Sequence, residues 1–186
     1  MNVLITGSTK GLGKAMAEEF RNQGYNVTTN GRYSGDIAKR TSQINIRDFK
    51  KCNPQIIVNN AFCLYDDIEQ QVLFLIKSIN YFAETGGTII NVNSVAGIYP
   101  DTIEPLYAAA KHALRGYSES VKFECMHRGI RIIDVYPGAI GCGLSEGRVD
   151  FTKLIDPKEL AEFIVTLCNT KSFVVSSIQF NRTNYG

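Results

Sequence analysis

The chain lacks tryptophan, has only two histidines, and has no two cysteines at the Cys-x-x-Cys spacing. Its five cysteines are an odd number at wide spacings: Cys52, Cys63, Cys125, Cys142 and Cys168. Zinc-type metal sites place cysteines and histidines at close spacings, and disulfide frameworks use cysteines in even numbers. We therefore expect reduced, mostly buried thiols and no metal site. The two histidines, His112 and His127, are expected on helix surfaces.

Long apolar runs and runs of one charge are also missing. No apolar stretch approaches the roughly 20 residues that a membrane helix needs. The net charge is +2, and no basic run is longer than two residues. This argues against a nucleic-acid or membrane partner. The N-terminus enters a glycine turn after a few apolar residues, unlike a signal or transit peptide, so we expect a cytoplasmic protein.

What remains is an ordinary globular composition without repeats, low-complexity segments or linkers. Hydrophobic residues make up 44% and charged residues 20% of 186 residues, which predicts a single domain over residues 1–186. Short runs rich in β-branched residues predict strands at 2–6, 26–29, 55–59, 88–93, 131–136 and 173–177. Helical periodicity predicts helices at 11–23, 66–84, 103–128 and 157–169. This alternation predicts an α/β fold, a parallel sheet with helices on both faces.

Polar or glycine-rich sequence follows almost every predicted strand. The segments are TGSTKGLG, NGRYSGD, NNAF, NSVAG and YPGAIGCG. Open parallel sheets bind their ligands beyond the carboxyl ends of the strands. The five segments therefore predict one site, built from five loops.

The first of these segments, Thr6–Gly13, joins a strand to an amphipathic helix. Glycines let the backbone approach a pyrophosphate, and a helix N-terminus offers unpaired N–H groups and partial positive charge. The segment is therefore predicted to bind a dinucleotide; an ordinary flexible turn is the alternative. The predicted contacts are Gly7, Ser8, Thr9, Lys10, Gly11, Leu12 and Gly13.

The sequence after the second strand bears on the choice of dinucleotide. A site for NAD usually has a carboxylate here, which accepts from the ribose 2′-OH. Here the chain reads Asn30-Gly31-Arg32, with no acid. Arg32 can pair with a 2′-phosphate, and Lys10 would be a second cation beside it. We therefore predict NADP(H) as the cofactor. The alternative is that both are solvated loop charges.

With these motifs, the chain resembles the short-chain dehydrogenase/reductase family from end to end. The resemblance rests on T-G-x-x-x-G-x-G at Thr6–Gly13, on Asn59-Asn60-Ala61-Phe62 and on Ser94 in NVNSVAG. It also rests on Y-x-x-x-K, with Tyr107 placed 13 residues after Ser94 (107 − 94) and followed by Lys111, and on Pro137-Gly138. It implies a single Rossmann-type doubly wound sheet of about six to seven strands in the order 3-2-1-4-5-6-7.

The resemblance also implies roles for these residues. Ser94, Tyr107 and Lys111 would be catalytic in an NADPH-dependent reduction of a carbonyl, or oxidation of the alcohol. Tyr107 would be the acid/base, and the charge of Lys111 would lower its pKa. Further cofactor contacts are implied at Asn45, Ile46, Asn60, Ala61, Phe62, Tyr107, Lys111, Pro137, Gly138 and Ile140. The partners implied are a small carbonyl or alcohol substrate and a second copy of the chain, as a homodimer or a tetramer.

Several positions depart from the family pattern. Phe62 stands where the family has glycine, and Cys142 where it has threonine. No asparagine lies in register to hold a proton-relay water; Gln70 and Gln71 are possible substitutes, with neither preferred. The segment at about 141–156 is short for a substrate loop. These departures leave a second hypothesis open, a protein of the same fold that binds or senses NADP(H) without catalysis.

Overall fold

The computed structural model describes residues 1–31, 35–37, 39, 41–62, 69–142, 154–170 and 172–183. Its strands are β1 (Asn2–Thr6), β2 (Asn26–Asn30), β3 (Ile56–Asn59), β4 (Gly87–Val92), β5 (Ile130–Pro137) and β6 (Ser177–Phe180). Its helices are α1 (Gly11–Asn22), α2 (Ile46–Cys52), α3 (Gln70–Phe82), α4 (Pro105–His127) and α5 (Pro157–Cys168), with 3₁₀ turns η1 (Thr41–Gln43) and η2 (Val95–Gly97).

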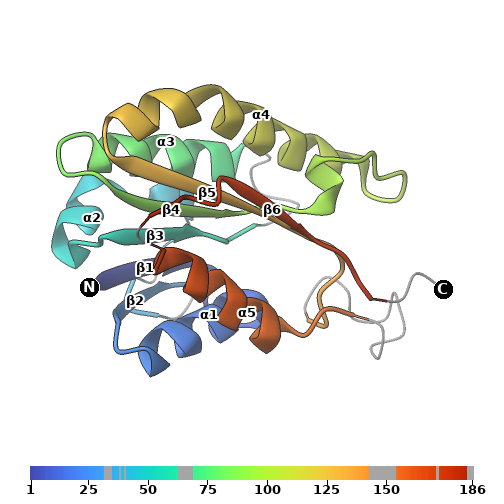
Figure 1. The fold of residues 1–186 in the computed structure, drawn as a ribbon, viewed down its shortest axis with the longest axis horizontal. Helices are drawn as coiled ribbons and strands as arrows, with labels where there is room; N and C mark the ends of the chain where they lie inside the picture. Colours follow the sequence, from blue (N-terminus) through green and yellow to red (C-terminus); the bar gives the residue numbers. More distant parts are fainter. Residues whose placement is uncertain are drawn as a thin grey trace.

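The strands form one six-stranded parallel sheet in the order β2-β1-β3-β4-β5-β6. Helices α3 and α4 cover one face of this sheet, and α1 and α5 cover the other (Figure 1). The predicted Rossmann-type doubly wound fold is therefore confirmed. All strands run the same way, so their carboxyl ends meet at one edge of the sheet, where such folds bind ligands.

The central strands are apolar on both sides, because helices pack on both faces of the sheet. In β1, Val3 and Ile5 pack into the core on the α1 and α5 side, whereas Leu4 packs into the core on the α3 and α4 side. The same alternation places Ile57 of β3 and Ile89 of β4 on the side of Leu4. The two cores hold the sheet between its helices and position the ends of its strands.

The outermost strand of the seven-stranded order is reduced to a single bridge. Asn30 pairs with Ile37 in an isolated parallel bridge, and the Asn30 side-chain nitrogen donates to the backbone oxygens of Ile37 (2.7 Å) and Lys39 (2.9 Å). In the part of the chain that the structure describes, no longer strand pairs with the outer edge of β2. The connection from β2 to β3 instead contains the short helix α2, which the sequence analysis had not predicted.

The last strand lies four residues later than predicted. Residues 173–177 are rich in β-branched and aromatic residues, but Phe173 and Val174 are exposed, and the strand that pairs with β5 is Ser177–Phe180. Pairing with β5 sets this register, which propensity alone cannot show, because an edge strand carries a weak apolar pattern.

The thiols also differ from expectation: Cys125 is buried, whereas Cys52, Cys142 and Cys168 are partly exposed, and Cys63 lies outside the described residues.

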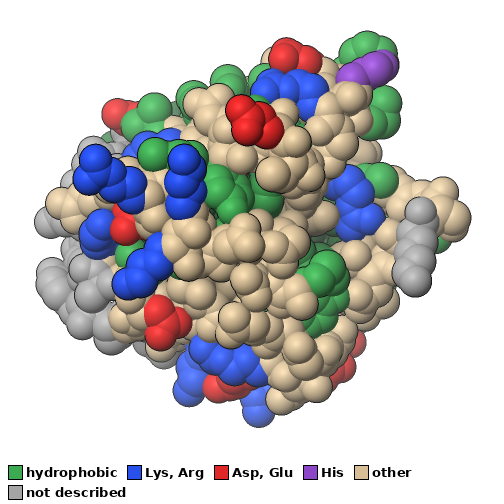
Figure 2. All heavy atoms as spheres, turned by 90° about the vertical axis from the view of Figure 1, so that its left-hand side faces the viewer, with side chains coloured by type: hydrophobic (Ala, Val, Ile, Leu, Met, Phe, Trp, Pro, Cys, Tyr) green, Lys and Arg blue, Asp and Glu red, His purple; other side chains and the backbone are tan. Residues whose placement is uncertain are grey.

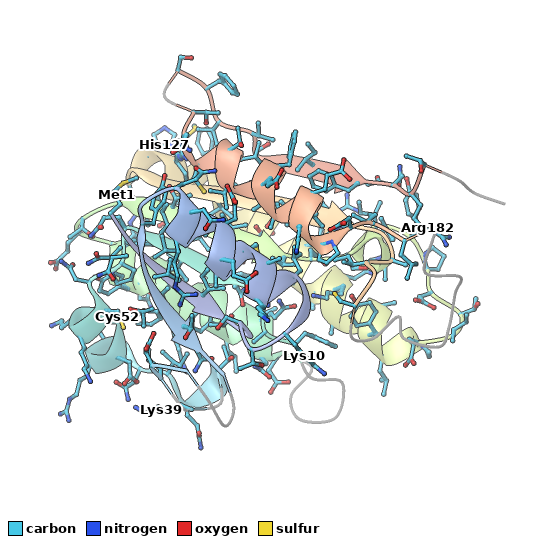
Figure 3. The ribbon with its side chains drawn as sticks, turned by 90° about the horizontal axis from the view of Figure 1, so that it is seen from below. Met1, Lys10, Lys39, Cys52, His127 and Arg182 are labelled. Atoms are coloured by element: carbon cyan, nitrogen blue, oxygen red, sulfur yellow. The ribbon has the colours of Figure 1, made fainter. Side chains whose placement is uncertain are left out.

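The amino-terminal edge of the sheet is separate from the predicted site. On this face, Lys, Arg, Asp and Glu side chains are scattered over a mostly uncharged surface, and several Lys and Arg side chains gather on one side (Figure 2). A shallow cavity of about 200 Å³ near this edge is lined by Met1, Gln23, Gly24, Tyr25 and Asn169, none of which was predicted to be functional. Lys10 of the glycine turn lies well away from Met1, Cys52 and His127, towards Arg182 (Figure 3). No described helix is long and apolar enough to cross a membrane.

Candidate active site

The glycine turn after β1 is a tight structure that only glycine fits at three positions. Gly7 and Gly11 have φ angles of +65° and +58°, which side chains rarely adopt. At Gly13, a Cβ atom would lie 2.3 Å from the Gly7 oxygen and 2.5 Å from the Asn60 side-chain nitrogen. The turn therefore brings the start of α1 close against the end of β3.

This turn leaves the N-terminus of α1 open. Lys10 is the N-cap residue, but its side chain makes no capping hydrogen bond, and Thr9 and Lys10 are exposed. The first N–H groups of a helix need partners, and an anion can provide them. Ser8 is different, because its backbone nitrogen and its hydroxyl both donate to the Asn30 oxygen at 3.2 Å. Ser8 thus ties the turn to β2.

Asn60 and Thr6 hold the ends of β1 and β3 together. The Asn60 side-chain nitrogen donates to the backbone oxygens of Thr6 (2.9 Å) and Gly7 (3.1 Å). The Thr6 hydroxyl accepts from the backbone nitrogens of Asn60 and Ala61, each at 3.0 Å. Asn60 and Ala61 therefore hold the glycine turn in place through hydrogen bonds to Thr6 and Gly7.

The three residues predicted to be catalytic come together at the carboxyl edge. Ser94 follows β4 and caps η2, where its hydroxyl accepts from the Ala96 nitrogen at 3.1 Å. Tyr107 lies in the first turn of α4, close enough to Ser94 for the serine side chain to act on its pKa. Lys111 lies one turn further along the same face of α4, with its Nζ atom 5.6 Å from the centre of the Tyr107 ring.

Lys111 is buried among neutral oxygen atoms. Its Nζ atom donates to the side-chain oxygen of Gln71 at 2.6 Å and to the backbone oxygen of Val92 at 3.0 Å. Burial disfavours the charged form of an amine, and it lowers the pKa of Lys111 to about 7. Lys111 therefore titrates close to neutral pH in this structure. Of the two glutamines considered in the sequence, Gln71 is the one that contacts the lysine.

The pKa of Tyr107 moves in the direction opposite to the one expected. Burial raises the pKa of Tyr107 above 10.0; the Ser94 hydrogen bond lowers it only in part, and the charge of Asp101 adds to the rise. The expectation that Lys111 would lower this pKa is wrong for the protein without a bound molecule. The physical reason is that burial outweighs the lowering by Ser94.

Phe62 covers the side chains of Tyr107 and Lys111. Its ring lies edge-on to the Tyr107 ring, with centres 5.1 Å apart, and the Nζ atom of Lys111 lies 4.9 Å from the centre of the Phe62 ring. The sequence marked this position as a departure from the family pattern, but it could not show that the ring turns towards Tyr107. Phe62 thus contributes to the burial of both titrating groups.

A chain of buried polar residues extends behind Lys111, and the sequence analysis missed it. The Asn59 side-chain nitrogen donates to the Asn91 side-chain oxygen at 3.0 Å, and the Asn91 nitrogen donates to the Asp134 carboxylate at 2.8 Å. Ser118 also donates to this carboxylate, and Lys122 forms an ion pair with it at 2.6 Å. Asn59, Asn91 and Asp134 are neighbours in register on three strands. A polar residue near the end of each apolar strand was the available signal.

The remaining predicted cofactor contacts come from other segments of the chain. Arg32 lies outside the described residues. Asn45 caps α2 by accepting from the Arg47 nitrogen at 3.0 Å, and Ile46 is the exposed first residue of that helix. Pro137 ends β5, the Gly138 nitrogen donates to the Phe180 oxygen at 2.8 Å, and Ile140 pairs with Ile155.

The segment after β5 also reaches the glycine turn. A Cβ atom on Gly11 would lie 2.9 Å from the Cys142 sulfur, so Cys142 stands beside the start of α1. Of the predicted short loop at about 141–156, residues 143–153 lie outside the described part. Among the described residues, no group of three or more His, Cys, Asp or Glu side chains is placed to hold a metal ion.

Fold and site together define a Rossmann-type protein with a serine, a tyrosine and a lysine at the carboxyl edge of its sheet. A family model described as short chain dehydrogenase matches residues 70–151. An uncharacterized oxidoreductase of Staphylococcus saprophyticus is 24% identical, over 92% of this chain and 92% of that protein. An uncharacterized oxidoreductase of Schizosaccharomyces pombe is 29% identical, over 81% of this chain and 64% of that protein.

Solved structures share the fold over nearly the whole chain. A short-chain dehydrogenase/reductase from Vibrio parahaemolyticus superposes with a TM-score of 0.79 at 22% identity, covering 99% of this chain and 98% of that one. An alcohol dehydrogenase from Thermococcus sibiricus, complexed with 5-hydroxy-NADP, has a TM-score of 0.79 at 17% identity (99% and 97% covered). A 3-ketoacyl-(acyl-carrier-protein) reductase from Brucella melitensis, complexed with NADH, has a TM-score of 0.78 at 21% identity (95% of each chain covered).

These findings show that the chain is similar to short-chain dehydrogenases/reductases, the family that its motifs resemble. The two relatives named above are described as oxidoreductases.

Proposed function

We propose that the protein is an NADPH-dependent oxidoreductase that reduces a small carbonyl compound, or oxidises the corresponding alcohol, with Tyr107 as the acid/base. The observation that carries the proposal is the grouping of three side chains at one strand edge. The Ser94 side chain acts on the pKa of Tyr107, and Lys111 lies one helical turn further along α4, with its Nζ atom 5.6 Å from the centre of the Tyr107 ring. The neighbours that contain NADP and NADH support a nicotinamide cofactor.

Each of the three residues has a distinct task in this proposal. Ser94 donates a hydrogen bond to the carbonyl oxygen and holds it beside Tyr107. In the reductive direction, the Tyr107 hydroxyl transfers its proton to that oxygen. A protonated Lys111 stabilises the phenolate that is left behind. Bound NADPH would supply the hydride to the carbonyl carbon.

The glycine turn fits the pyrophosphate of such a cofactor. The uncapped start of α1 offers N–H groups, and the glycines permit close approach of the backbone. The preference for NADP(H) over NAD(H) rests on Lys10, which is exposed at this turn, and on Arg32. Equal affinities for NADPH and NADH, measured by fluorescence titration, would contradict this preference.

One structural feature favours the second candidate, a protein that binds NADP(H) without catalysis. Phe62 lies against both Tyr107 and Lys111, the two residues that would contact the nicotinamide ribose and the substrate. If Phe62 stays there, cofactor would bind without hydride transfer. Turnover of NADPH with any carbonyl in a panel of aldehydes and ketones excludes this candidate. Tight NADPH binding without turnover supports it.

We further propose that two copies associate through α4, with a tetramer as the alternative. Leu106 and Phe123 of α4 are 60% and 72% exposed, and Leu73 of α3 is 42% exposed, so these apolar side chains are accessible to a second copy. Sedimentation velocity with and without NADPH tests this state, and a monomer under both conditions contradicts it. The cytoplasmic location expected from the sequence remains a prediction.

A further inference from the structure

The side chain of Gln71 links three elements behind the proposed active site. It lies in the first turn of α3 and is only 3% exposed. Its oxygen accepts from the Nζ atom of Lys111 at 2.6 Å. Its nitrogen donates to the backbone oxygens of Asn59 (3.3 Å) and Val92 (3.2 Å), at the ends of β3 and β4. Gln71 therefore connects the sheet edge directly to the lysine.

The orientation of this amide follows from its partners. The two backbone oxygens can only accept hydrogen bonds, so the Gln71 nitrogen must face them. An ammonium group can only donate, so the Gln71 oxygen must face Lys111. With the amide reversed, two N–H donors would meet the ammonium and an oxygen would meet two carbonyls. The contacts therefore permit one orientation, in which Gln71 always presents an acceptor to Lys111.

The surroundings of the Lys111 ammonium hold no carboxylate in hydrogen-bond contact, within the described residues. Besides Gln71 and Val92, it faces the rings of Phe62 and Tyr107. Tyr107 is the titrating group nearest to it on α4. Asp134 on β5 is separated from it by the Asn91 and Asn59 amides and is paired with Lys122.

The remaining charges near α3 are directed elsewhere or are not described. Lys77, further along α3, donates to the Ile44 oxygen at 3.0 Å. Asp101 acts on Tyr107. Glu69 is exposed at the start of α3, and Asp66 and Asp67 before it lie outside the described residues. Lys111 is therefore held by neutral acceptors in the described structure.

We propose that Gln71 is the positioning residue of this site, which clamps the Lys111 ammonium beside Tyr107 through a neutral oxygen and leaves its positive charge uncancelled. The proposal rests on the proposed function for its consequence in catalysis, but the clamp itself does not. A glutamate at this position would hold the lysine equally well, but its negative charge would offset the positive charge of the ammonium group. The lowered pKa of Lys111, about 7, agrees with a neutral clamp.

The proposal predicts how the charge of Lys111 responds to residue 71. With Gln71→Glu, a carboxylate replaces the amide at the same distance, and the pKa of Lys111 rises by roughly 1–3 units. With Gln71→Met, the side chain keeps its length but loses the acceptor, and the pKa of Lys111 falls below the wild-type value. Gln70→Glu is the matched control, because it adds the same charge one residue earlier, on a different side of the helix.

The test is an NMR titration of the cofactor-free protein labelled with ¹³C at the lysine Cε atoms, with Lys111→Met used to assign the signal. The expected result is a Lys111 signal that titrates near pH 7 in the wild type, shifts upward in Gln71→Glu, and moves by less than about half a unit in Gln70→Glu. A Lys111 pKa that is the same in Gln71→Glu and the wild type overturns the proposal. So does a Gln70→Glu shift as large as that of Gln71→Glu.

A second readout separates this proposal from the proposed function. If the wild type turns over NADPH, the pH at which kcat/KM changes with Lys111 ionisation should move upward in Gln71→Glu in parallel with the NMR value. If the wild type shows no turnover with any carbonyl, the proposed function fails, while the NMR titration still decides whether Gln71 sets the state of Lys111. Circular dichroism confirms that each variant is folded.

Discussion

The rings of Phe62 and Tyr107 meet edge to face, with their centres 5.1 Å apart and their planes at 76°. The Nζ atom of Lys111 is closer to the centre of the Phe62 ring (4.9 Å) than to that of the Tyr107 ring (5.6 Å). Phe62 therefore shields both titrating residues, and it helps to explain why burial raises the pKa of Tyr107 and lowers that of Lys111.

Replacing Phe62 with alanine should cost stability but favour cofactor binding. The lost ring contact should lower the free energy of unfolding by about 0.5–1.5 kcal/mol beyond the loss of buried area. With the ring gone, the face of Tyr107 and Lys111 is accessible, so the dissociation constant for NADPH should fall by up to about tenfold. Fluorescence titration measures the affinity, with Phe62→Leu as a bulky control. Weaker NADPH binding by a folded Phe62→Ala variant would show that the ring supports the cofactor.

The glycine turn should not tolerate the smallest side chain at Gly13. A Cβ atom there meets the Gly7 backbone oxygen at 2.3 Å, so Gly13→Ala should lose at least about 1–3 kcal/mol of stability and most of the cofactor affinity. Gly116→Ala in α4 is the matched exchange, because nothing lies within 4 Å of its Cβ position. It should gain about 0.5–1 kcal/mol from helix propensity. Urea unfolding measures the change in stability of both variants. Equal changes for Gly13→Ala and Gly116→Ala would contradict the packing described for Gly13.

Lys111 should make stability rise with pH on the alkaline side of neutrality. Its pKa is about 7 in the folded protein and returns to its ordinary 10.5 on unfolding. Between these values the unfolded chain binds more protons, so this group adds up to about 1.4 kcal/mol of stability per pH unit. Tyr107 acts oppositely only above about pH 10, because its folded pKa is raised.

The corresponding measurement is urea unfolding at pH 7, 8 and 9 for the wild type and Lys111→Met. Subtracting the two curves removes the contribution of the cysteines, whose pKa values are raised by burial in both proteins. The wild type should gain stability relative to the variant as pH rises. A difference that is flat with pH would show that Lys111 keeps an ordinary pKa.

The buried ion pair behind the site should matter far more than an exposed one. Asp134 has a fully buried side chain and pairs with Lys122 at 2.6 Å, while it also accepts from Asn91 and Ser118. Asp134→Asn keeps the shape but leaves Lys122 without its counter-charge, which should cost about 3–5 kcal/mol. Glu124→Gln breaks an exposed pair with Arg128 and should cost less than about 1 kcal/mol. Thermal unfolding compares the stability of the two variants. Similar losses of stability would contradict a structural role for the buried network around Asp134.

The sequence could predict the sheet and most of the helices because their signals are local. The strand Asn2–Thr6 is a short apolar run followed by a glycine turn, and α4 has a long helical period ending before Gly129. The edge strand β6 was misplaced because its register depends on pairing with β5. The outer strand next to β2 was expected from the resemblance and is only a bridge at Asn30, since few residues are available there.

The candidate site was predictable in its residues but not in its electrostatics. Motif spacing predicts that Ser94, Tyr107 and Lys111 meet at the carboxyl edge of the sheet. The structure brings these three residues together there. Whether Gln70 or Gln71 faces the lysine depends on the rotation of α3, which its sequence leaves open. The direction of the Tyr107 shift depends on how deeply Phe62 and its neighbours bury the hydroxyl, which is a property of packing and not of spacing.

The central claim is that Tyr107 acts as the acid/base of NADPH-dependent carbonyl reduction. The most direct test mixes purified protein with NADPH and a panel of aldehydes and ketones and follows the loss of NADPH absorbance, for the wild type and Tyr107→Phe. Tyr107→Phe removes only the hydroxyl, so it should retain NADPH binding and lose turnover by roughly 10²-fold or more. No turnover by the wild type, or wild-type turnover by Tyr107→Phe, would contradict the claim.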